Sequence, residues 1–163
     1  MNQPPRKIKA YVAGPMTGLP DFNRPAFFDA AGVLFDHGHI VLNPAVFPDG
    51  LEHSDYMKIC LPMIDAAEAV ILLPGWEKSK GANMEYQYAL IKRLPVFEAE
   101  FGYASSDDNR KLGIFDFGPE SVYASTVVKP RDYRYGPALR LNVIAVSDNP
   151  DAPNLSEWST CVR

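Results

Sequence analysis

The sequence has little cysteine and no long apolar segment. Its two cysteines, Cys60 and Cys161, are too few for a disulfide framework, and their spacing is not that of metal ligands. No apolar run approaches the roughly 20 residues that a membrane-spanning helix requires. Residues 1–9 are polar and proline-rich and lack the apolar core of a signal peptide. We therefore expect a cytoplasmic protein with reduced thiols and no membrane contact.

Positive charge is also scarce. The chain has 16 Lys and Arg residues against 20 Asp and Glu residues, which gives a net charge of -4. Binding to polymeric nucleic acid through its phosphates needs an excess of basic residues, so we do not expect such a partner. The three histidines, His37, His39 and His53, lack the spacing of metal ligands. We expect them at the surface or in turns, and we expect no metal site.

The remaining composition is that of an ordinary globular protein. The chain has 163 residues, of which 47% are hydrophobic and 22% are charged, so it suits one domain and excludes wholesale disorder. Residues 1–100 form the predicted core, and residues 101–163 form a C-terminal extension of the same domain. A lid and an oligomer contact are both open for the extension. Its recognisable segments are two candidate strands and one irregular stretch: 114–117, 139–146 and 148–156.

Short apolar strands alternate with helical patterns in the core. Four runs are apolar almost throughout and end near turn residues, as buried strands do: 8–13, 40–42, 69–73 and 95–97. Three helical patterns lie between them, one from Asn23 to Gly38, one over 55–67 and one over 82–92. We expect Ser54 to cap the second helix and Pro62 to kink or break it. The alternation predicts an α/β fold with a parallel sheet that helices cover on both faces.

Three turn segments follow strands of the predicted sheet, at the end where α/β proteins bind ligands. The first is Gly14-Pro15-Met16-Thr17-Gly18, the second is Asn43-Pro44, and the third covers residues 74–81. The first segment is neither a dinucleotide-binding fingerprint nor a Walker loop. Its glycines indicate a close approach of the backbone, either to a ligand or within a tight turn.

Two carboxylates are candidates for chemistry. Glu85 lies in the first turn of its predicted helix, where the helix dipole favours an ionised carboxylate and hence a nucleophile. The alternative is that Glu85 only stabilises the helix N-terminus. Asp65 lies among apolar residues before a strand, and is either a turn residue or a second catalytic acid. Paired carboxylates are typical of enzymes that cleave glycosidic bonds.

Three other side chains have an ordinary structural interpretation beside a functional one. Tyr11 lies inside the first strand, where a buried tyrosine is usually a core residue with a satisfied hydroxyl. Cys60 lies on an apolar helix face and is better explained as core than as nucleophile. Trp76 either stacks on a ligand base or shields its loop.

The order of these residues resembles the nucleoside 2-deoxyribosyltransferase superfamily. The resemblance rests on a strand with Tyr11, then Gly14-Pro15, then Asp65 before a strand, then Gly81-x-x-Met84-Glu85-Tyr86-x-x-Ala89. It covers roughly residues 8 to 98 and includes the branch that hydrolyses 2′-deoxynucleoside 5′-monophosphates. The small, uncharacterised phage and bacterial members are the most similar.

This resemblance implies a fold and a mechanism. The fold is a flavodoxin-like or Rossmann-like three-layer α/β sandwich with a parallel sheet of about five strands. Glu85 takes the place of a nucleophile that attacks C1′ of the sugar, Asp65 that of an acid that assists the departing base, and Tyr11 that of a residue that orients the nucleophile. The resemblance implies no cofactor, a nucleoside or nucleotide substrate, and a homodimer or larger homo-oligomer.

Ser79 bears on the kind of substrate. Transferases of the superfamily often have a second Asp six residues before the nucleophile, whereas the monophosphate hydrolases have a serine that helps to hold the 5′-phosphate. Ser79 is at this position, and Lys78 and Lys80 beside it favour a phosphate; a solvated loop tip is the alternative. We predict substrate binding by residues of the turn segments: Gly14, Pro15, Met16, Thr17, Ser79, Gly81 and Trp76.

Three functions stay open at this point. The first is an enzyme that cleaves or transfers the N-glycosidic bond of a (deoxy)nucleoside or its 5′-monophosphate. The second is a non-catalytic module that senses or sequesters a nucleotide on the same fold. The third is an interaction protein, because aromatic and arginine residues of the extension are typical of interfaces. These residues are Tyr123, Arg131, Tyr133, Arg134 and Tyr135.

Overall fold

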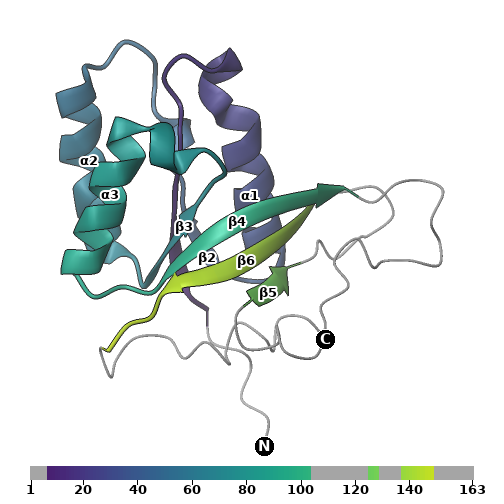
Figure 1. Ribbon diagram of the computed structural model, residues 1–163. Helices are drawn as coiled ribbons and strands as arrows, with labels where there is room; N and C mark the ends of the chain where they lie inside the picture. The colour runs from purple at the N-terminus through teal and green to yellow at the C-terminus, as the bar shows by residue number, and fades with distance from the viewer. Residues whose placement is uncertain (1–6, 104–124, 129–136, 149–163) are drawn as a thin grey trace, which may run out of the picture.

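A six-stranded mixed sheet forms the centre of the protein (Figure 1). The computed structural model describes residues 7–103, 125–128 and 137–148. The strand order across the sheet is β2-β1-β3-β4-β6-β5. The strands are β1 (Lys9–Ala13), β2 (Ile40–Leu42), β3 (Ala69–Leu72), β4 (Val96–Tyr103), β5 (Ser125–Val128) and β6 (Pro137–Ala145).

Strands β2, β1, β3 and β4 are parallel, as the sequence predicts for the core. Strand β6 then pairs antiparallel with β4, and β5 pairs antiparallel with β6. The sheet is therefore mostly parallel, with an antiparallel edge. Such edges are common on α/β sheets, because an antiparallel neighbour needs no helical crossover.

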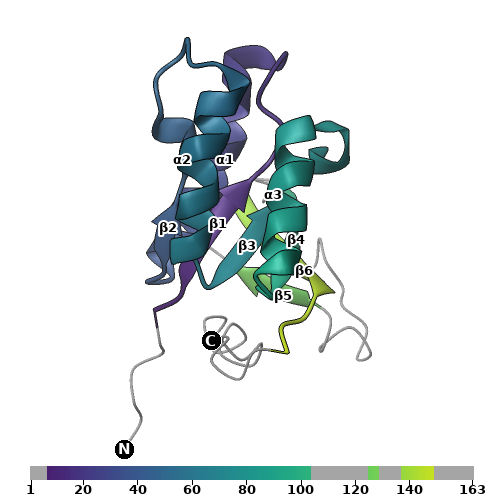
Figure 2. The same ribbon diagram turned by 90° about the vertical axis from the view of Figure 1, so that its left-hand side faces the viewer.

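Helices cover both faces of the sheet, which confirms the predicted Rossmann-like α/β sandwich. Figures 1 and 2 show α1 (Arg24–Asp36) on one face and α2 (His53–Ala66) with α3 (Lys80–Ile91) on the other. Short 3-10 helices precede or follow these elements: η1 (Pro20–Asn23), η2 (Pro44–Val46) and η3 (Trp76–Lys78). The two layers of helices bury a separate hydrophobic cluster on each face of the sheet.

Strand β1 shows how the sequence divides its side chains between these clusters. Successive residues of a strand point to opposite faces. Ala10 and Val12 pack in the cluster beneath α1, whereas Tyr11 and Ala13 pack in the cluster beneath α2 and α3. This alternation places the Tyr11 side chain on the same face of the sheet as α3.

The helix boundaries differ from the predictions by a few residues. Helix α2 begins at His53 after Glu52, so Ser54 is not its cap. The helix contains Pro62 without a break. Helix α3 begins at Lys80, because the Ser79 side chain accepts a hydrogen bond from the backbone N–H of Ala82 and caps the helix.

Asn23 precedes α1 as predicted, but it does not cap the helix with its side chain. Its backbone is left-handed, with φ of 57°. Its amide Nδ2 instead donates a 2.9 Å hydrogen bond to the carbonyl of Pro15. Asn23 therefore ties the start of α1 to the turn that follows β1.

The described part of the C-terminal extension belongs to the same sheet as the core. Strand β4 crosses the predicted boundary at residue 100, and β6 confirms the strand predicted over 139–146. Other predictions for the extension lie outside the described residues: the strand at 114–117, residues 149–156, Cys161, and the aromatic and arginine group from Tyr123 to Tyr135.

Candidate active site

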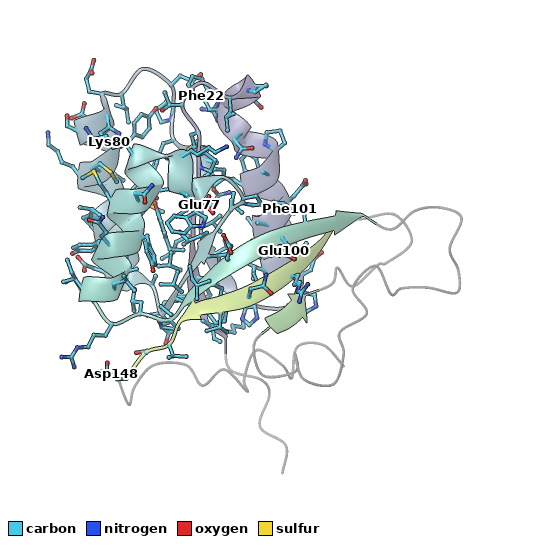
Figure 3. The ribbon with its side chains drawn as sticks, in the orientation of Figure 1. Phe22, Glu77, Lys80, Glu100, Phe101 and Asp148 are labelled. Atoms are coloured by element: carbon cyan, nitrogen blue, oxygen red, sulfur yellow. The ribbon has the colours of Figure 1, made fainter. Side chains whose placement is uncertain are left out.

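A cavity of about 340 Å³ lies at the carboxyl ends of β1, β2 and β3. Its walls come from the segments after these strands and from the N-terminal parts of the three helices. Figure 3 shows Phe22 and Lys80 at this end of the molecule, opposite to Asp148. The lining residues are Gly14, Met16, Thr17, Phe22, Arg24, Phe27, Pro44, Phe47, Asp49, Gly50, Leu51, His53, Tyr56, Met57, Cys60, Ser79, Gly81, Ala82 and Glu85.

Glu85 is the buried carboxyl group of this cavity, with only 6% of its surface exposed. Burial raises its pKa from 4.5 to about 7, although hydrogen bonds with Tyr11 and Cys60 oppose the rise. The expectation that the helix dipole keeps Glu85 ionised is wrong. Because α3 begins at Lys80, Glu85 lies in the second turn, where the dipole is weak, and desolvation dominates.

The hydroxyl of Tyr11 donates a 2.7 Å hydrogen bond to Oε1 of Glu85. Tyr11 is fully buried. Burial, together with the neighbouring Glu85, raises the phenol pKa well above its usual value. The phenol therefore stays protonated and is a permanent donor. The structure thus brings Tyr11 and Glu85 together, as the resemblance implied, and it satisfies the hydroxyl of a core tyrosine.

Cys60 completes this buried group. Its side chain lines the cavity and interacts with Tyr11 and Glu85. Burial raises the pKa of its thiol to about 11. A thiol with that pKa is almost entirely protonated at neutral pH, which agrees with its interpretation as a core residue.

The turn after β1 contributes Gly14, Met16 and Thr17 to the cavity. A Cβ atom at Gly14 would lie 2.8 Å from Cβ of Leu73, so this glycine is required for packing against the end of β3. The close approach that the sequence indicated is therefore one between two segments of the chain. Pro15 is not a lining residue, and its ring lies toward Gly75.

The segment before α3 contributes Ser79 and Gly81. The Ser79 hydroxyl accepts from Ala82 N–H at 3.2 Å and keeps its own proton available for donation. Lys78 and Lys80 do not line the cavity. The position of Ser79 thus suits a ligand hydroxyl or phosphate, while the cap accounts for its local role.

The structure does not bring Asp65 to Glu85. Asp65 lies in the last turn of α2, which runs from the cavity to the opposite end of the sheet. There its Oδ1 accepts a 2.9 Å hydrogen bond from Tyr88 and forms a 2.9 Å ion pair with Lys92. The hydrogen bonds from Lys92 and Tyr88 lower the Asp65 pKa. Asp65 therefore fastens α2 to the C-terminal end of α3 and is not a second acid of the cavity.

Trp76 also lies outside the cavity lining. Its indole Nε1 donates a 2.9 Å hydrogen bond to Oε1 of Glu98. Its ring centroid is 4.8 Å from that of Tyr86. These contacts agree with the interpretation that Trp76 shields its loop, and they do not favour stacking on a ligand base.

Residues 8–98, more than half of the chain, match the domain of unknown function DUF4406. The chain belongs to the DUF4406 family. A search of curated proteins finds none that matches it. Every described residue that lines the cavity lies within the matched range.

Several cavity residues of the DUF4406 domain were not among the residues predicted from the sequence. Most of them follow Asn43-Pro44 or lie just before or within the first turn of α1. Asn43-Pro44 is a turn at the carboxyl end of a strand, which could have indicated the residues that follow it. His53 is exposed, as predicted, but it lies at the cavity as the first residue of α2. The other missed polar and aromatic residues are Phe22, Arg24, Phe27, Phe47, Asp49 and Tyr56.

One histidine of the DUF4406 domain departs from its predicted surface position. His39 is only 4% exposed. Its Nδ1 accepts a hydrogen bond from the backbone N–H of Ile8 at 3.4 Å. Burial lowers its pKa, and His37 nearby adds to this effect. Among residues 7–103, 125–128 and 137–148, no group of three or more His, Cys, Asp or Glu side chains is arranged to hold a metal ion. No helix in this described part is long and apolar enough to cross a bilayer.

Proposed function

We propose that this DUF4406 protein cleaves or transfers the N-glycosidic bond of a (deoxy)nucleoside or its 5′-monophosphate. The observation that carries the proposal is the buried Glu85 carboxyl group in the cavity, held by the Tyr11 hydroxyl at 2.7 Å. A fixed anion beside C1′ stabilises the positive charge that develops on a sugar as its base departs. The resemblance to nucleoside 2-deoxyribosyltransferases supplies the substrate class.

In the proposed mechanism Glu85 acts as the nucleophile. An ionised oxygen of Glu85 attacks C1′, the bond from C1′ to the base nitrogen breaks, and the base leaves with the bonding electrons. Water or a second base then attacks C1′ and releases Glu85. Tyr11 orients the carboxylate through its hydrogen bond. Asp65 has no part in these steps, because it lies at the other end of α2.

The size and lining of the cavity support such a substrate. A volume of about 340 Å³ is at the lower end of the range for small-molecule sites. Phe22, Phe47 and Tyr56 provide aromatic surface for a base. The segment from Gly14 to Thr17 and the Ser79 hydroxyl provide polar groups for a sugar or a phosphate.

A non-catalytic nucleotide-binding module is the second candidate function. It is favoured by the pKa of about 7 at Glu85, which leaves much of the carboxyl group protonated at neutral pH. The absence of Asp65 from the cavity favours it as well. For either function we propose a homodimer or larger assembly, as the resemblance implies, and a cytoplasmic location, as the sequence predicts.

The test is a chromatographic assay for released base. Ribo- and deoxyribonucleosides and their 5′-monophosphates are incubated with the full chain, with and without a second base as acceptor. We expect base release or exchange by the unmodified protein and by Glu77→Gln, a matched change at an exposed residue outside the cavity. We expect no base release or exchange with Glu85→Gln. In the unmodified protein, mass spectrometry should detect a sugar adduct on Glu85.

The other outcomes decide between the two functions. Full turnover by Glu85→Gln would contradict the mechanism. Saturable binding of a nucleotide by folded protein, without base release from any substrate of the panel, would favour the binding module.

A further inference from the structure

The cavity contains a second carboxylate, Asp49, on the segment between η2 and α2. Its side chain is 60% exposed, in contrast to the buried Glu85. Asp49 therefore lies at the solvent side of the cavity. Because it follows β2, whereas Glu85 comes from α3 after β3, the two carboxylates reach the cavity from opposite sides of β1.

Arg24 fixes Asp49 in position. Its Nη2 pairs with Oδ1 of Asp49. The same guanidinium donates to the carbonyls of Ala45 at 3.2 Å and Phe47 at 3.4 Å. Only 19% of the Arg24 side chain is exposed, so these bonds are partly shielded from water. Within the described residues Oδ2 of Asp49 has no hydrogen-bond partner, which leaves this oxygen for a ligand.

A second contact holds the same segment. The Tyr56 hydroxyl donates a 2.8 Å hydrogen bond to the carbonyl of Pro48, the residue before Asp49. The backbone that leads into Asp49 is thus anchored twice, to α1 by Arg24 and to α2 by Tyr56. A carboxylate on an anchored backbone is pre-organised and loses little freedom when a ligand binds.

The surroundings of Asp49 are aromatic. Phe22, Phe47 and Tyr56 line the cavity with it, and the Arg24 guanidinium lies 5.2 Å from the centroid of the Phe22 ring. Because Glu85 and Asp49 reach the cavity from opposite sides of β1, a ligand that contacts both extends across the carboxyl end of β1. With C1′ at Glu85, the part of a nucleoside that reaches this aromatic end is the outer edge of its base.

Resting on the proposed function, we propose that Asp49 recognises an exocyclic amino group on the base and so selects amino-bearing bases over oxo-bearing ones. A carboxylate oxygen accepts a hydrogen bond from an amino group of adenine or cytosine. The carbonyl oxygen of hypoxanthine or uracil at the same place would face the carboxylate as a second acceptor and would be rejected. The preference thus has an attractive and a repulsive part.

The test compares nucleosides that differ only in this group. Calorimetric affinities for adenosine and inosine, and for cytidine and uridine, are measured on the Glu85→Gln chain, which binds without turnover. We expect the amino-bearing member of at least one pair to bind roughly 10- to 100-fold more tightly, as for a hydrogen bond to a charged group. Adding Asp49→Asn should bring that ratio to within about threefold, because an asparagine offers both a donor and an acceptor.

Asp21→Asn is the matched control. Asp21 also pairs with Arg24, at 3.3 Å, but it does not line the cavity. The preference should survive this change; its loss would show that the preference is not specific to Asp49 and would overturn the inference. Equal affinities within both pairs, or a preference that survives Asp49→Asn, would overturn the inference and leave the proposed function standing. Failure of all nucleosides and their monophosphates to bind folded protein would overturn both.

Discussion

Tyr11 and Glu85 are joined by a 2.7 Å hydrogen bond between two buried side chains on neighbouring elements of the core. The bond stabilises the ionised form of Glu85, whereas burial favours the neutral form. The protonation of the proposed nucleophile is thus set by a balance between desolvation and the hydrogen bonds from Tyr11, the larger of the two, and Cys60. This balance makes the role of Tyr11 measurable.

Turnover should depend on pH through Glu85. Because the ionised form attacks, base release should rise with pH through a midpoint near the Glu85 pKa of about 7. Tyr11→Phe removes a donor to the carboxylate, so the midpoint should move upward by roughly one to two pH units. Tyr88→Phe, which loses a similar bond to Asp65 outside the cavity, should leave the midpoint unchanged. An unshifted profile in Tyr11→Phe would limit Tyr11 to a packing role.

Glu85→Gln should make the protein more resistant to alkaline pH. The native state holds the Glu85 proton more tightly than the unfolded chain, since the pKa is about 7 in one and 4.5 in the other. The stability that the neutral carboxyl contributes is complete below pH 4.5 and is lost as pH rises through about 7. Above this range, the ionised Glu85 lowers the free energy of unfolding by on the order of 3 kcal/mol at most. In denaturant unfolding at pH 5 and pH 8.5, the free energy of unfolding of the variant should increase relative to that of the unmodified protein only at the higher pH.

Gly14→Ala should destabilise the fold by about 1–3 kcal/mol, because the new methyl group would meet Cβ of Leu73 at 2.8 Å. Gly32→Ala is the control. Gly32 lies within α1 with no atom within 4 Å of its added Cβ, so alanine should stabilise the helix by about 0.5–1 kcal/mol. Thermal unfolding of the two variants should therefore shift in opposite directions. Equal stability of Gly14→Ala and the unmodified protein would refute the packing role of Gly14.

Asp65→Asn should leave base release essentially unchanged. The side chain is exposed and pairs with Lys92 and Tyr88 at the far end of α3 from the cavity. The resemblance alone implied a role in the departure of the base, so this variant separates the resemblance from the structure. A large loss of turnover in a variant with normal unfolding behaviour would restore that role.

The regular part of the fold follows from local sequence patterns. The apolar runs at 8–13 and 69–73 became buried strands, because a strand covered on both faces carries apolar residues throughout. The run at 40–42 also became a strand, but it lies at the edge of the sheet and Ile40 is exposed, so its predicted burial is wrong. The antiparallel pairing of β6 with β4 was not predictable, since it depends on contacts between residues distant in sequence. Such pairings leave no local pattern.

The part of the site that was predicted also follows from local sequence patterns. Tyr11 and Glu85 belong to a strand and a helix whose buried faces follow from the periodicity of apolar residues. The two side chains form a hydrogen bond in the structure. Asp65 was wrongly predicted to lie in the cavity. It belongs to the last turn of α2, whose first residues lie at the cavity and whose last residues lie at the opposite end of the sheet. Asp49 and Arg24 were missed because a loop residue and a helix residue pair across a distance that no spacing reveals.

The position of β4 within the sheet has a consequence for how this protein can diverge. Strand β4 has β3 on one side and β6 on the other, and every described residue that lines the cavity lies between Gly14 and Glu85. The antiparallel edge therefore contributes none of the described lining of the cavity. Substitutions in that edge, for example ones that alter a subunit contact, would leave this lining in place.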